Sequence, residues 1–434
     1  MFGFDSARGN AGPATTGITA ASLGSLRRQQ VEVGGTVDSS PIYLSAVSVE
    51  GRLRDTFFVT TTYGITEAID AESGRILWRF KPPGYSGYAG SSQVTTMTPV
   101  ADPGRAAVYA GAPDGRIRKL SVATGKVLWS TAITLDPRHE KLASALNFAG
   151  GLVLAATSGY SGDPPPYDGH VISLNPANGK IVGVFNTLCS NRHGIIRASS
   201  CPVSDSAIWG RSAPVVDPRT GNLLVATGNG AFDGVSNWGD SVLDLSPDAS
   251  KLIVHWTPVN QLSLNSQDLD LGSTAPAILE DDYVVQGGKD GTLRLLNLSR
   301  FAGVNATTGG ELQTLSVPGS GELLSEPAVW QGTWVFVASC CGTAAWRLAG
   351  GRLHPAWSNE NGGASPVLAG GLLYVQSTNA IRVYQPSTGR QVGAIPVGET
   401  HWQSPIVADG RIAAGEGSFH DHDTSGVLNI YRLP

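Results

Sequence analysis

A short motif recurs eight times along the 434 residues, and it limits the folds that this chain can adopt. Each copy combines a small residue, a proline and an apolar stretch, as in "SSPIYL", "SAPVVD" and "QSPIVA". The copies are centred on Pro41, Pro99, Pro214, Pro276, Pro327, Pro366 and Pro405, and a copy without proline, "SALNFAGG", begins at Ser144. Repeats of this length indicate a solenoid, a propeller or another array.

Each repeat unit is predicted to contain four antiparallel β-strands. Glycine-containing turns alternate with β-branched stretches such as "LLVATG" and "GLLYVQS", and the last strand of several units carries an aromatic residue. Alternation and turn spacing of this kind indicate strands. Four-stranded units repeated eight times predict an all-β fold, the eight-bladed β-propeller. The aromatic residues are expected to dock each blade on the next; they are Trp78, Trp129, Phe185, Trp256 and Trp357.

The eighth unit lacks a fourth strand, because only "GVLNIYRLP" follows its second strand. An orphan stretch near the start, "GSLRRQQVEVGG" at residues 24–35, has no unit of its own. We expect this N-terminal strand to pair with the last blade and close the ring, which leaves no exposed sheet edge. The chain is therefore predicted to consist of an N-terminal extension, residues 1–23, and a single propeller domain, residues 24–434.

Composition excludes two classes of partner. The net charge is −5 and no basic run exceeds Arg27-Arg28, so the chain does not bind a nucleic-acid backbone by bulk charge. No stretch approaches the apolar length that a membrane-spanning helix needs. Charged residues make up 15% of the chain, below the roughly 25% of ordinary soluble domains, which suits short strands joined by tight turns.

One face of the predicted ring carries the long loops. If the strands of a blade are called A to D, the B–C and D–A connections lie on one face, because antiparallel neighbours reverse direction. The long irregular segments are of these two kinds; they span residues 158–169, 186–212, 228–241 and 258–274. Long loops carry function more often than short ones. We therefore expect a functional site on this face.

The four cysteines predict two disulfides and an exported protein. Cys189 and Cys201 share one polar loop, and Cys340 and Cys341 are adjacent at a B–C turn of the sixth blade. An even count in this arrangement is typical of oxidised, secreted proteins. The polar start after Met1 is no signal peptide, so an exported chain would be numbered from after its leader. Four reduced thiols in a cytosolic protein, with a reactive dithiol at the adjacent pair, remain the alternative.

Three stretches resemble the quinoprotein alcohol dehydrogenases, propellers that hold pyrroloquinoline quinone (PQQ) and Ca²⁺ on their axis. In "WGRSAPVVDPRTGNLLVATGNG" the resemblance implies that Trp209 stacks on the quinone and that Asn229 binds the metal. In "SQDLDLGSTAPAIL" it implies a catalytic carboxylate, Asp268 or Asp270, with Asp270 also beside the metal. In "GGKDGTLRLLN" it implies that Lys289 contacts the quinone.

The resemblance implies the oxidation of an alcohol or a sugar by a secreted, periplasmic or envelope protein that passes electrons to an external acceptor. A hard cation binds carboxylate and amide oxygens, and together with an ammonium group it polarises an ortho-quinone. An Asp beside them accepts the alcohol proton while hydride passes to the cofactor. The tight turns "TGNG" and "KDG" allow a purely structural role for Asn229 and Lys289, because these residue types also suit turns.

The sequence also departs from that family. The family's metal site includes a Glu in the B–C loop of the third blade, where this chain has "TSGYSGDPPPYDGHV", with Asp163 and Asp168 as the available carboxylates. The family's adjacent cysteines cap the quinone from near the start of the ring, whereas Cys340 and Cys341, assigned here to the same capping role, belong to the sixth blade. There is no CxxCH motif for a c-type haem.

A histidine cluster in the eighth unit supports a different function. His401 precedes the unit, and His420 and His422 lie in "FHDHDTSG". In an extended chain both rings of His-x-His point the same way, and three imidazoles suit Zn²⁺ or Cu²⁺. The alternatives to the dehydrogenase are therefore a metal-dependent lyase or hydrolase, and a non-catalytic binding propeller of the envelope. An exposed polar hairpin explains the histidines equally, and His401 beside Trp402 also suits sugar binding.

Overall fold

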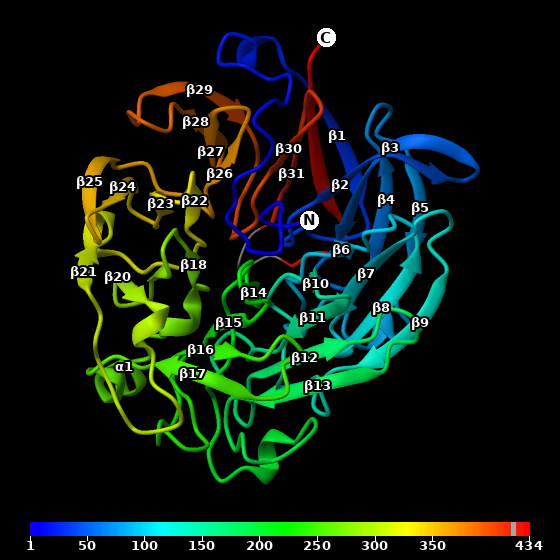
Figure 1. The fold of residues 1–434 in the computed structure, drawn as a ribbon. Coiled ribbons are helices and arrows are strands. Elements are labelled where there is room, and N and C mark those ends of the chain that lie inside the picture. Colours follow the sequence, from blue (N-terminus) through cyan, green and yellow to red (C-terminus); the bar gives the residue numbers. More distant parts are fainter. Residues whose placement is uncertain (418–421) are drawn as a thin grey trace.

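The strands surround a central axis as eight blades (Figure 1). The structure is a computed structural model that describes residues 1–417 and 422–434. In this part of the chain the strands form eight four-stranded antiparallel sheets. The predicted all-β, eight-bladed propeller is confirmed, with the A strand of each blade innermost.

The first four blades follow one another along the chain without interruption. Blade 1 contains β2 (Ile42–Val49), β3 (Arg52–Thr60), β4 (Thr66–Asp70) and β5 (Ile76–Phe80). Blade 2 contains β6 (Val100–Ala101), β7 (Ala107–Ala112), β8 (Arg116–Ser121) and β9 (Val127–Ala132). Blade 3 contains β10 (Asn147–Ala149), β11 (Leu152–Ala156), β12 (His170–Leu174) and β13 (Ile181–Asn186). Blade 4 contains β14 (Val215–Val216), β15 (Leu223–Ala226), β16 (Val242–Leu245) and β17 (Leu252–Trp256).

The remaining blades complete the ring. Blade 5 contains β18 (Ala277–Ile278), β19 (Tyr283–Gln286), β20 (Thr292–Asn297) and β21 (Gln313–Ser316). Blade 6 contains β22 (Ala328–Trp330), β23 (Trp334–Ala338), β24 (Thr343–Ala349) and β25 (Arg352–Asn359). Blade 7 contains β26 (Val367–Ala369), β27 (Leu372–Ser377), β28 (Ala380–Tyr384) and β29 (Gln391–Pro396). Blade 8 contains β30 (Ile406–Ala408), β31 (Arg411–Gly415), β32 (Gly426–Arg432) and, from the other end of the chain, β1 (Arg27–Val33).

Helices are short and lie in the connections. The α-helix α1 (Gln261–Gln267) belongs to the segment between blades 4 and 5. The 3₁₀ turns are η1 (Leu23–Ser25), η2 (Tyr85–Gly87), η3 (Ala198–Ser200), η4 (Leu271–Ser273), η5 (Leu298–Arg300) and η6 (Pro318–Ser320). Among the described residues, none of the helices has the length and apolarity to cross a membrane.

The N-terminal strand closes the ring, as predicted. β1 pairs with β32 in an antiparallel register that runs from Arg27 opposite Arg432 to Val33 opposite Gly426. At the end of β1 the buried Val31 and Val33 flank the exposed Glu32, and Val31 and Leu428 join the buried core between blades 8 and 1. Pairing of opposite ends of the chain therefore removes the free edge of the last blade.

The residue before each repeat proline links neighbouring blades. At four junctions its backbone N–H donates to the side-chain oxygen of the equivalent residue in the next blade. The donors and acceptors are Ser40 to Thr98 (2.9 Å), Ala275 to Glu326 (2.8 Å), Glu326 to Ser365 (2.8 Å) and Ser404 to Ser40 (2.9 Å). Proline keeps the residue before it extended, so this position faces the next blade. The recurring small hydroxyl residue is thus a hydrogen-bond acceptor at the axis.

Tryptophans dock blades at their outer strands. The indole Nε1 of Trp78 donates to the carbonyl of Val122 in the next blade at 2.8 Å, and Trp129 and Trp357 make the equivalent bonds to Pro176 and Pro386. Each ring lies on a glycine of the neighbouring C–D turn; Gly125, with φ +69°, lies on Trp78 at a point where a Cβ would meet the ring. Glycine is therefore needed both for the left-handed turn and for the close approach.

Residues 2–16 lie against the inner strands of the ring, and the N-terminus lies near its centre (Figure 1). The backbone carbonyls of this segment accept hydrogen bonds from several blades; the pairs are Ser6 with Val216, Gly9 with Val329, Asn10 with Leu368 and Thr16 with Gly410. The buried Arg8 guanidinium donates to the carbonyls of Phe2 and Leu146. The division of the chain into an extension and a propeller domain at residue 23 stays a prediction.

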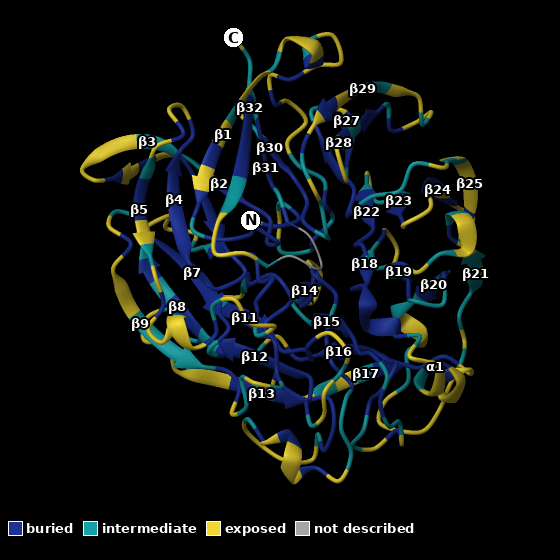
Figure 2. Cartoon of the chain, turned by 180° about the vertical axis from the view of Figure 1, so that it is seen from behind, coloured by how far each residue is buried: buried dark blue, intermediate teal, exposed yellow. Residues whose placement is uncertain are grey.

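Burial follows the radial order of the strands. Figure 2 shows buried inner strands, whereas exposed residues gather on outer strands and on the loops. The largest hydrophobic clusters span two or more neighbouring sheets, as in the cluster that joins β11, β15 and β19. The core is therefore distributed between blades and does not form one central mass.

Ring closure predicts that the apolar face of β1 is essential for stability. Val31→Asp places a carboxylate in the core between blades 8 and 1, and burial of such a charge without a partner is unfavourable. We expect a loss of at least about 3 kcal/mol in the free energy of unfolding, measured by denaturant titration. The control Glu32→Ala alters the exposed face of the same strand and should unfold as the parent does. Equal stability of the two variants would contradict the closure.

Candidate active site

The residues predicted to hold a cofactor converge on the face with the long loops. Trp209 lies between β13 and β14, and Asn229 lies in the turn between β15 and β16. Asp268 and Asp270 follow α1, and Lys289 lies between β19 and β20. These are D–A and B–C connections of blades 3 to 5, so three neighbouring blades contribute to one site.

Asp270 is the centre of this site and is 1% exposed. Its Oδ1 accepts the backbone N–H of Asn229 at 2.6 Å, and its Oδ2 lies 2.5 Å from Lys289 Nζ. The backbone N–H of Lys289 also donates to the Asp270 carbonyl at 3.0 Å. The more exposed Asp268 lies 3.3 Å from the same ammonium. The lysine is therefore fixed between two carboxylates, one buried and one open to solvent.

Trp209 and Gly228 complete the surroundings of Asp270. The backbone N–H of Trp209 donates to the carbonyl of Gly272 at 3.2 Å, which joins the two loops. A Cβ on Gly228 would overlap Asp270 Oδ1 and would lie 3.4 Å from Trp209 Cδ1. The backbone of Gly228 is thus in direct contact with the carboxylate and the indole, and a larger residue would separate them.

Burial and the neighbouring charges shift the pKa of Asp270, and likewise that of Lys289, in opposite directions. Burial raises the pKa of Asp270 above its ordinary value, although the Lys289 charge and the Asn229 N–H favour the carboxylate. For Lys289, burial lowers the pKa, but the charges and hydrogen bonds of Asp270 and Asp268 outweigh it and raise the pKa. The lysine therefore stays cationic, and the aspartate is a stronger base than an exposed one.

Asp163, from the B–C loop of blade 3, lies in the electrostatic field of this site. Burial, followed by the charges of Asp270 and Asp268, raises its pKa to about 6. The other candidate in that loop, Asp168, lies away from the pair; its Oδ1 accepts from Thr187 Oγ1 at 2.9 Å and from the Leu188 N–H at 3.1 Å. Of the two carboxylates considered for the missing Glu, Asp163 is the one near Asp270.

Two polar atoms of the site lack a hydrogen-bond partner within the described part of the chain: Asn229 Oδ1 and Trp209 Nε1. A polar planar ring fits these atoms, together with the Lys289 ammonium. A calcium site fits less well, because Ca²⁺ takes six to eight oxygen ligands. The described residues contain no group of three His, Cys, Asp or Glu side chains arranged for a metal.

All four cysteines are paired, Cys189 with Cys201 and Cys340 with Cys341. The first pair packs with Leu188 and Ile196 inside the long D–A segment after blade 3. The adjacent pair lies on the B–C turn of blade 6 against Gly319 and Gly321, where added Cβ atoms would meet the cysteine side chains. Both pairs belong to the face with the long loops. A capping role of Cys340 and Cys341 over a cofactor stays a prediction.

The predicted histidine cluster lies only partly within the described residues. His401 Nδ1 lies 2.7 Å from Asp38 Oδ2, and the His422 carbonyl accepts the Tyr63 hydroxyl at 2.8 Å. His420 lies outside the described residues. Metal binding by the three histidines therefore stays a prediction.

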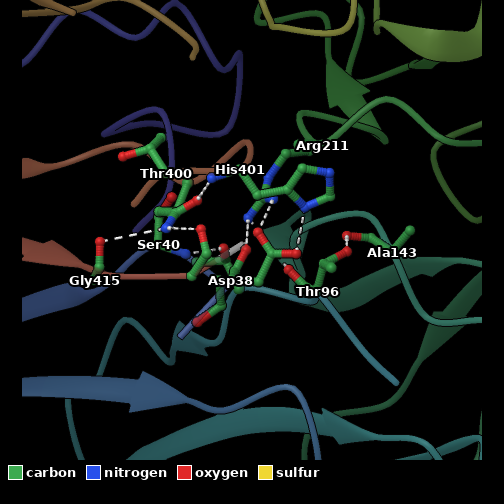
Figure 3. Close-up of polar contacts among 12 residues, drawn as sticks. Asp38, Ser40, Thr96, Ala143, Arg211, Thr400, His401 and Gly415 are labelled. Carbon is green, nitrogen blue, oxygen red and sulfur yellow. Dashed lines mark hydrogen bonds and ion pairs between the residues drawn. The ribbon is translucent and has the colours of Figure 1, made fainter. Parts of the chain in front are cut away.

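Asp38 and Arg211 are central residues that sequence reasoning missed (Figure 3). Arg211 Nη2 donates to the carbonyls of Asp38 at 2.6 Å and Thr96 at 3.3 Å, and its Nη1 lies 3.7 Å from Asp38 Oδ1. Burial alone would raise the pKa of Asp38, but the facing His401, Arg211 and Lys141 hold it below its ordinary value. This axial cluster joins the loops before blades 1, 2, 4 and 8.

The sequence did contain a signal for these two residues. Each stands three positions before the proline of its repeat unit. The equivalent residues of the other units carry no charge; they are Thr96, Ala143, Ser273, Leu324, Gly363 and Trp402, with Leu146 in the place of the proline of the third unit. One acidic and one basic residue at repeat-equivalent positions of a ring can meet at its axis.

Gly228 gives a direct test of the close packing around Asp270. Gly228→Ala should displace the carboxylate or the indole, and we expect a loss of about 1–3 kcal/mol in the free energy of unfolding, as for other overpacked sites. Thermal and denaturant unfolding measure the effect. The matched control is Gly303→Ala, since a Cβ at Gly303 meets no atom within 4 Å. If both variants unfold alike, the packing described here is wrong.

The raised pKa of Asp163 predicts that the difference in stability between the parent protein and Asp163→Asn depends on pH. Its folded pKa of about 6 lies above the ordinary value of 3.8, so the folded state keeps a proton that the unfolded state releases. Stability from this group is complete below the ordinary pKa and is lost as the pH rises through about 6. Asp163→Asn cannot ionise, so its stability advantage over the parent should grow between about pH 4 and about pH 7.5.

Melting temperatures of the parent and Asp163→Asn at both pH values test this prediction. The exposed Asp281, on the A–B turn of blade 5, supplies the control Asp281→Asn. A constant difference between parent and Asp163→Asn at the two pH values would contradict the electrostatic coupling to Asp270 and Asp268.

Comparison with known proteins finds similarity to PQQ-repeat propellers and to quinoprotein alcohol dehydrogenases. Residues 36–194 match the family model described as outer membrane protein assembly factor BamB. The chain is 24% identical over 220 residues to polyvinylalcohol dehydrogenase of Pseudomonas sp, an alignment that covers 48% of this chain and 33% of that protein. It is 27% identical over 210 residues to quinohemoprotein alcohol dehydrogenase ADH IIB of Pseudomonas putida, an alignment that covers 44% of this chain and 30% of that protein.

Among solved structures, the fold resembles quinohemoprotein alcohol dehydrogenase from Comamonas testosteroni, with a TM-score of 0.74 at 14% identity; the match covers 100% of this chain and 80% of that one. At this identity the likeness shows the fold alone. The chain spans about a third of the length of the curated relatives named above. The repeats, the eight-bladed ring and these matches support a relationship of this chain to the PQQ-repeat β-propellers.

Proposed function

We propose that this propeller is a quinoprotein-type oxidoreductase that oxidises an alcohol or a sugar at the Asp270–Lys289 site. The observation that carries the proposal is the buried Asp270, 2.5 Å from Lys289 Nζ and next to Trp209 and Asn229. Sequence relatives named as alcohol dehydrogenases support it. A bound ortho-quinone such as PQQ would supply the hydride acceptor.

The chain's own residues perform the remaining tasks. Asp270 accepts the hydroxyl proton of the substrate, because its raised pKa makes it a better base than an exposed carboxylate. Lys289 holds Asp270 in place and presents a positive charge to electron-rich oxygens. Trp209 offers a flat face and an indole N–H to a planar ring. The two electrons of the alcohol then leave to an external acceptor.

Calcium is the weaker part of the proposal. Asn229 and Asp270 together supply too few oxygen donors for the six to eight ligands of Ca²⁺, and the further carboxylates around Asp270 include Asp163, Asp240 and Asp268. We propose a periplasmic or other envelope location, which the two disulfides support.

The proposal predicts a separation of binding from turnover. Purified protein should bind PQQ in a calorimetric titration and reduce an artificial dye when given primary alcohols or aldoses, tested with and without Ca²⁺. Asp270→Asn should lower the rate about a hundred-fold or more, because it removes the base, while PQQ binding remains. Lys289→Met should weaken binding as well as turnover. Asp281→Asn, on the opposite face, should leave both unchanged.

The outcome decides between two functions. Absence of PQQ binding by the parent protein under both conditions would overturn the oxidoreductase and favour a binding propeller of the envelope. One structural feature favours that second candidate: the outer strands β9, β13 and β17 of neighbouring blades expose apolar side chains, namely Val127, Leu128, Ile181, Val182 and Ile253. Exposed apolar side chains on neighbouring outer strands fit a protein partner.

A further inference from the structure

A second polar site lies apart from Asp270, in a cavity of about 560 Å³ between blades 6, 7 and 8. We call it the blade 6–8 cavity; its walls include Cys340, Ser377, Thr378, Arg382, His401 and Trp402. These residues come from the B–C turn of blade 6, the B–C end of blade 7 and the D–A segment before blade 8. The volume lies within the range that holds a sugar-sized ligand.

The lining of this cavity matches the chemistry of a polyhydroxylated molecule. The hydroxyls of Ser325, Ser339, Ser377 and Thr400 donate to backbone carbonyls, which leaves their oxygens as acceptors, and the exposed Thr378 hydroxyl can both donate and accept. The Glu322 carboxylate accepts bonds from ligand hydroxyls. Trp402 and the disulfide at Cys340 supply apolar surface for the carbon skeleton. Many small polar groups with one aromatic ring favour a sugar over a wholly apolar ligand.

Arg382 adds a preference for a carboxylate. Its guanidinium is half-buried on β28 and donates to Ser377 Oγ, which fixes the direction of the side chain. Within residues 1–417 and 422–434 no carboxylate forms an ion pair with it. Glu322, the acidic residue on the cavity wall, is exposed to solvent. A guanidinium held in place this way suits bidentate recognition of a ligand carboxylate.

The opposite wall is also fixed in position. His401 Nδ1 lies 2.7 Å from Asp38 Oδ2, and the His401 ring stacks on Trp402 with centroids 3.5 Å apart. Arg211 Nη2 in turn donates to the backbone carbonyl of Asp38 at 2.6 Å (Figure 3). The aromatic wall is therefore anchored to the axis of the ring, and a ligand would meet a preformed surface.

We propose that the blade 6–8 cavity binds a sugar acid, with the ligand carboxylate on Arg382 and its hydroxyls on the serine, threonine and Glu322 side chains. This site uses none of the residues of the proposed oxidation at Asp270, and its ligand binding does not require a cofactor. The proposal therefore stands or falls independently of the oxidoreductase.

Calorimetric titration of the purified full chain with D-glucuronate and with D-glucose tests the proposal, without added PQQ. Glucuronate should bind at least about ten-fold more tightly than glucose, because one charge-assisted pair is added. Arg382→Met should weaken glucuronate binding by about 10- to 100-fold and leave glucose binding unchanged. Arg382→Lys should retain part of the preference. The control Arg390→Met alters an exposed arginine on the C–D turn of the same blade and should bind as the parent does.

A second measurement uses the parent protein alone and so does not depend on the folding of a variant. Phenylglyoxal modifies accessible arginines, and glucuronate should protect Arg382 but not Arg390, as mapped by mass spectrometry. Equal affinity for glucuronate and glucose, binding of neither sugar, or unprotected Arg382 would overturn the proposal. Competitive displacement of glucuronate by PQQ would also overturn it, since the cavity would then belong to the quinone.

Discussion

The hydrogen bonds at the residue before each repeat proline determine how the blades meet. At four junctions the residue at this position donates its N–H to the side-chain oxygen of the equivalent residue in the next blade, as Ser40 does to Thr98. Where this residue is alanine, as at Ala145 and Ala213, the side chain offers no acceptor. Glu326 occupies the equivalent position before blade 6; its Oε2 accepts from Ala275 at 2.8 Å, and burial raises its pKa to about 7 despite that bond and the nearby Arg211 charge. The inner ring thus depends on a polar seam, whereas apolar packing holds the outer parts of the blades.

The charges at the axis build on this seam. Asp38 and Arg211 occupy repeat-equivalent positions in blades 1 and 4, and their contact crosses the centre of the ring. Because Arg211 lies two residues after Trp209, the contact also positions the loop that carries the indole of the candidate site. His401, bonded to Asp38, transfers the same constraint to the wall of the blade 6–8 cavity. One buried aspartate therefore fixes segments on both sides of the axis, and through them two separate sites.

The sequence was sufficient for the architecture because every blade repeats the same local signals: a small residue before proline, two turns and an aromatic outer strand. The closing strand β1 could be predicted because one unit was short by one strand and one stretch had no unit. Strand order predicted that Trp209, Asn229, Asp270 and Lys289 share one face, but the resemblance to the quinoprotein dehydrogenases was needed to single them out. The distances between side chains could not be predicted from the sequence. The pairing of Asp38 with His401 joins residues that are 363 positions apart, and no spacing rule relates them. The sequence named both Asp163 and Asp168 as available carboxylates but could not choose between them, since the choice depends on how their loop folds.

The Asp38–Arg211 and Asp270–Lys289 ion pairs differ in how far the stability of the fold accounts for them. Arg211 and Asp38 join four loops, and the guanidinium donates to two backbone carbonyls, so its burial is compensated by bonds that hold the ring together. Asp270 and Lys289 join neighbouring loops that backbone bonds already connect, at Trp209 to Gly272 and at Lys289 to Asp270. A buried ion pair contributes little net stability after its desolvation. Asn229 Oδ1 and Trp209 Nε1 beside it have no hydrogen-bond partner among the described residues, which costs about 1–3 kcal/mol each. Folding alone gives no reason to place these groups together. Such groups lower the stability of the fold when the chain itself offers them no partners. We therefore expect them where a ligand supplies the missing contacts.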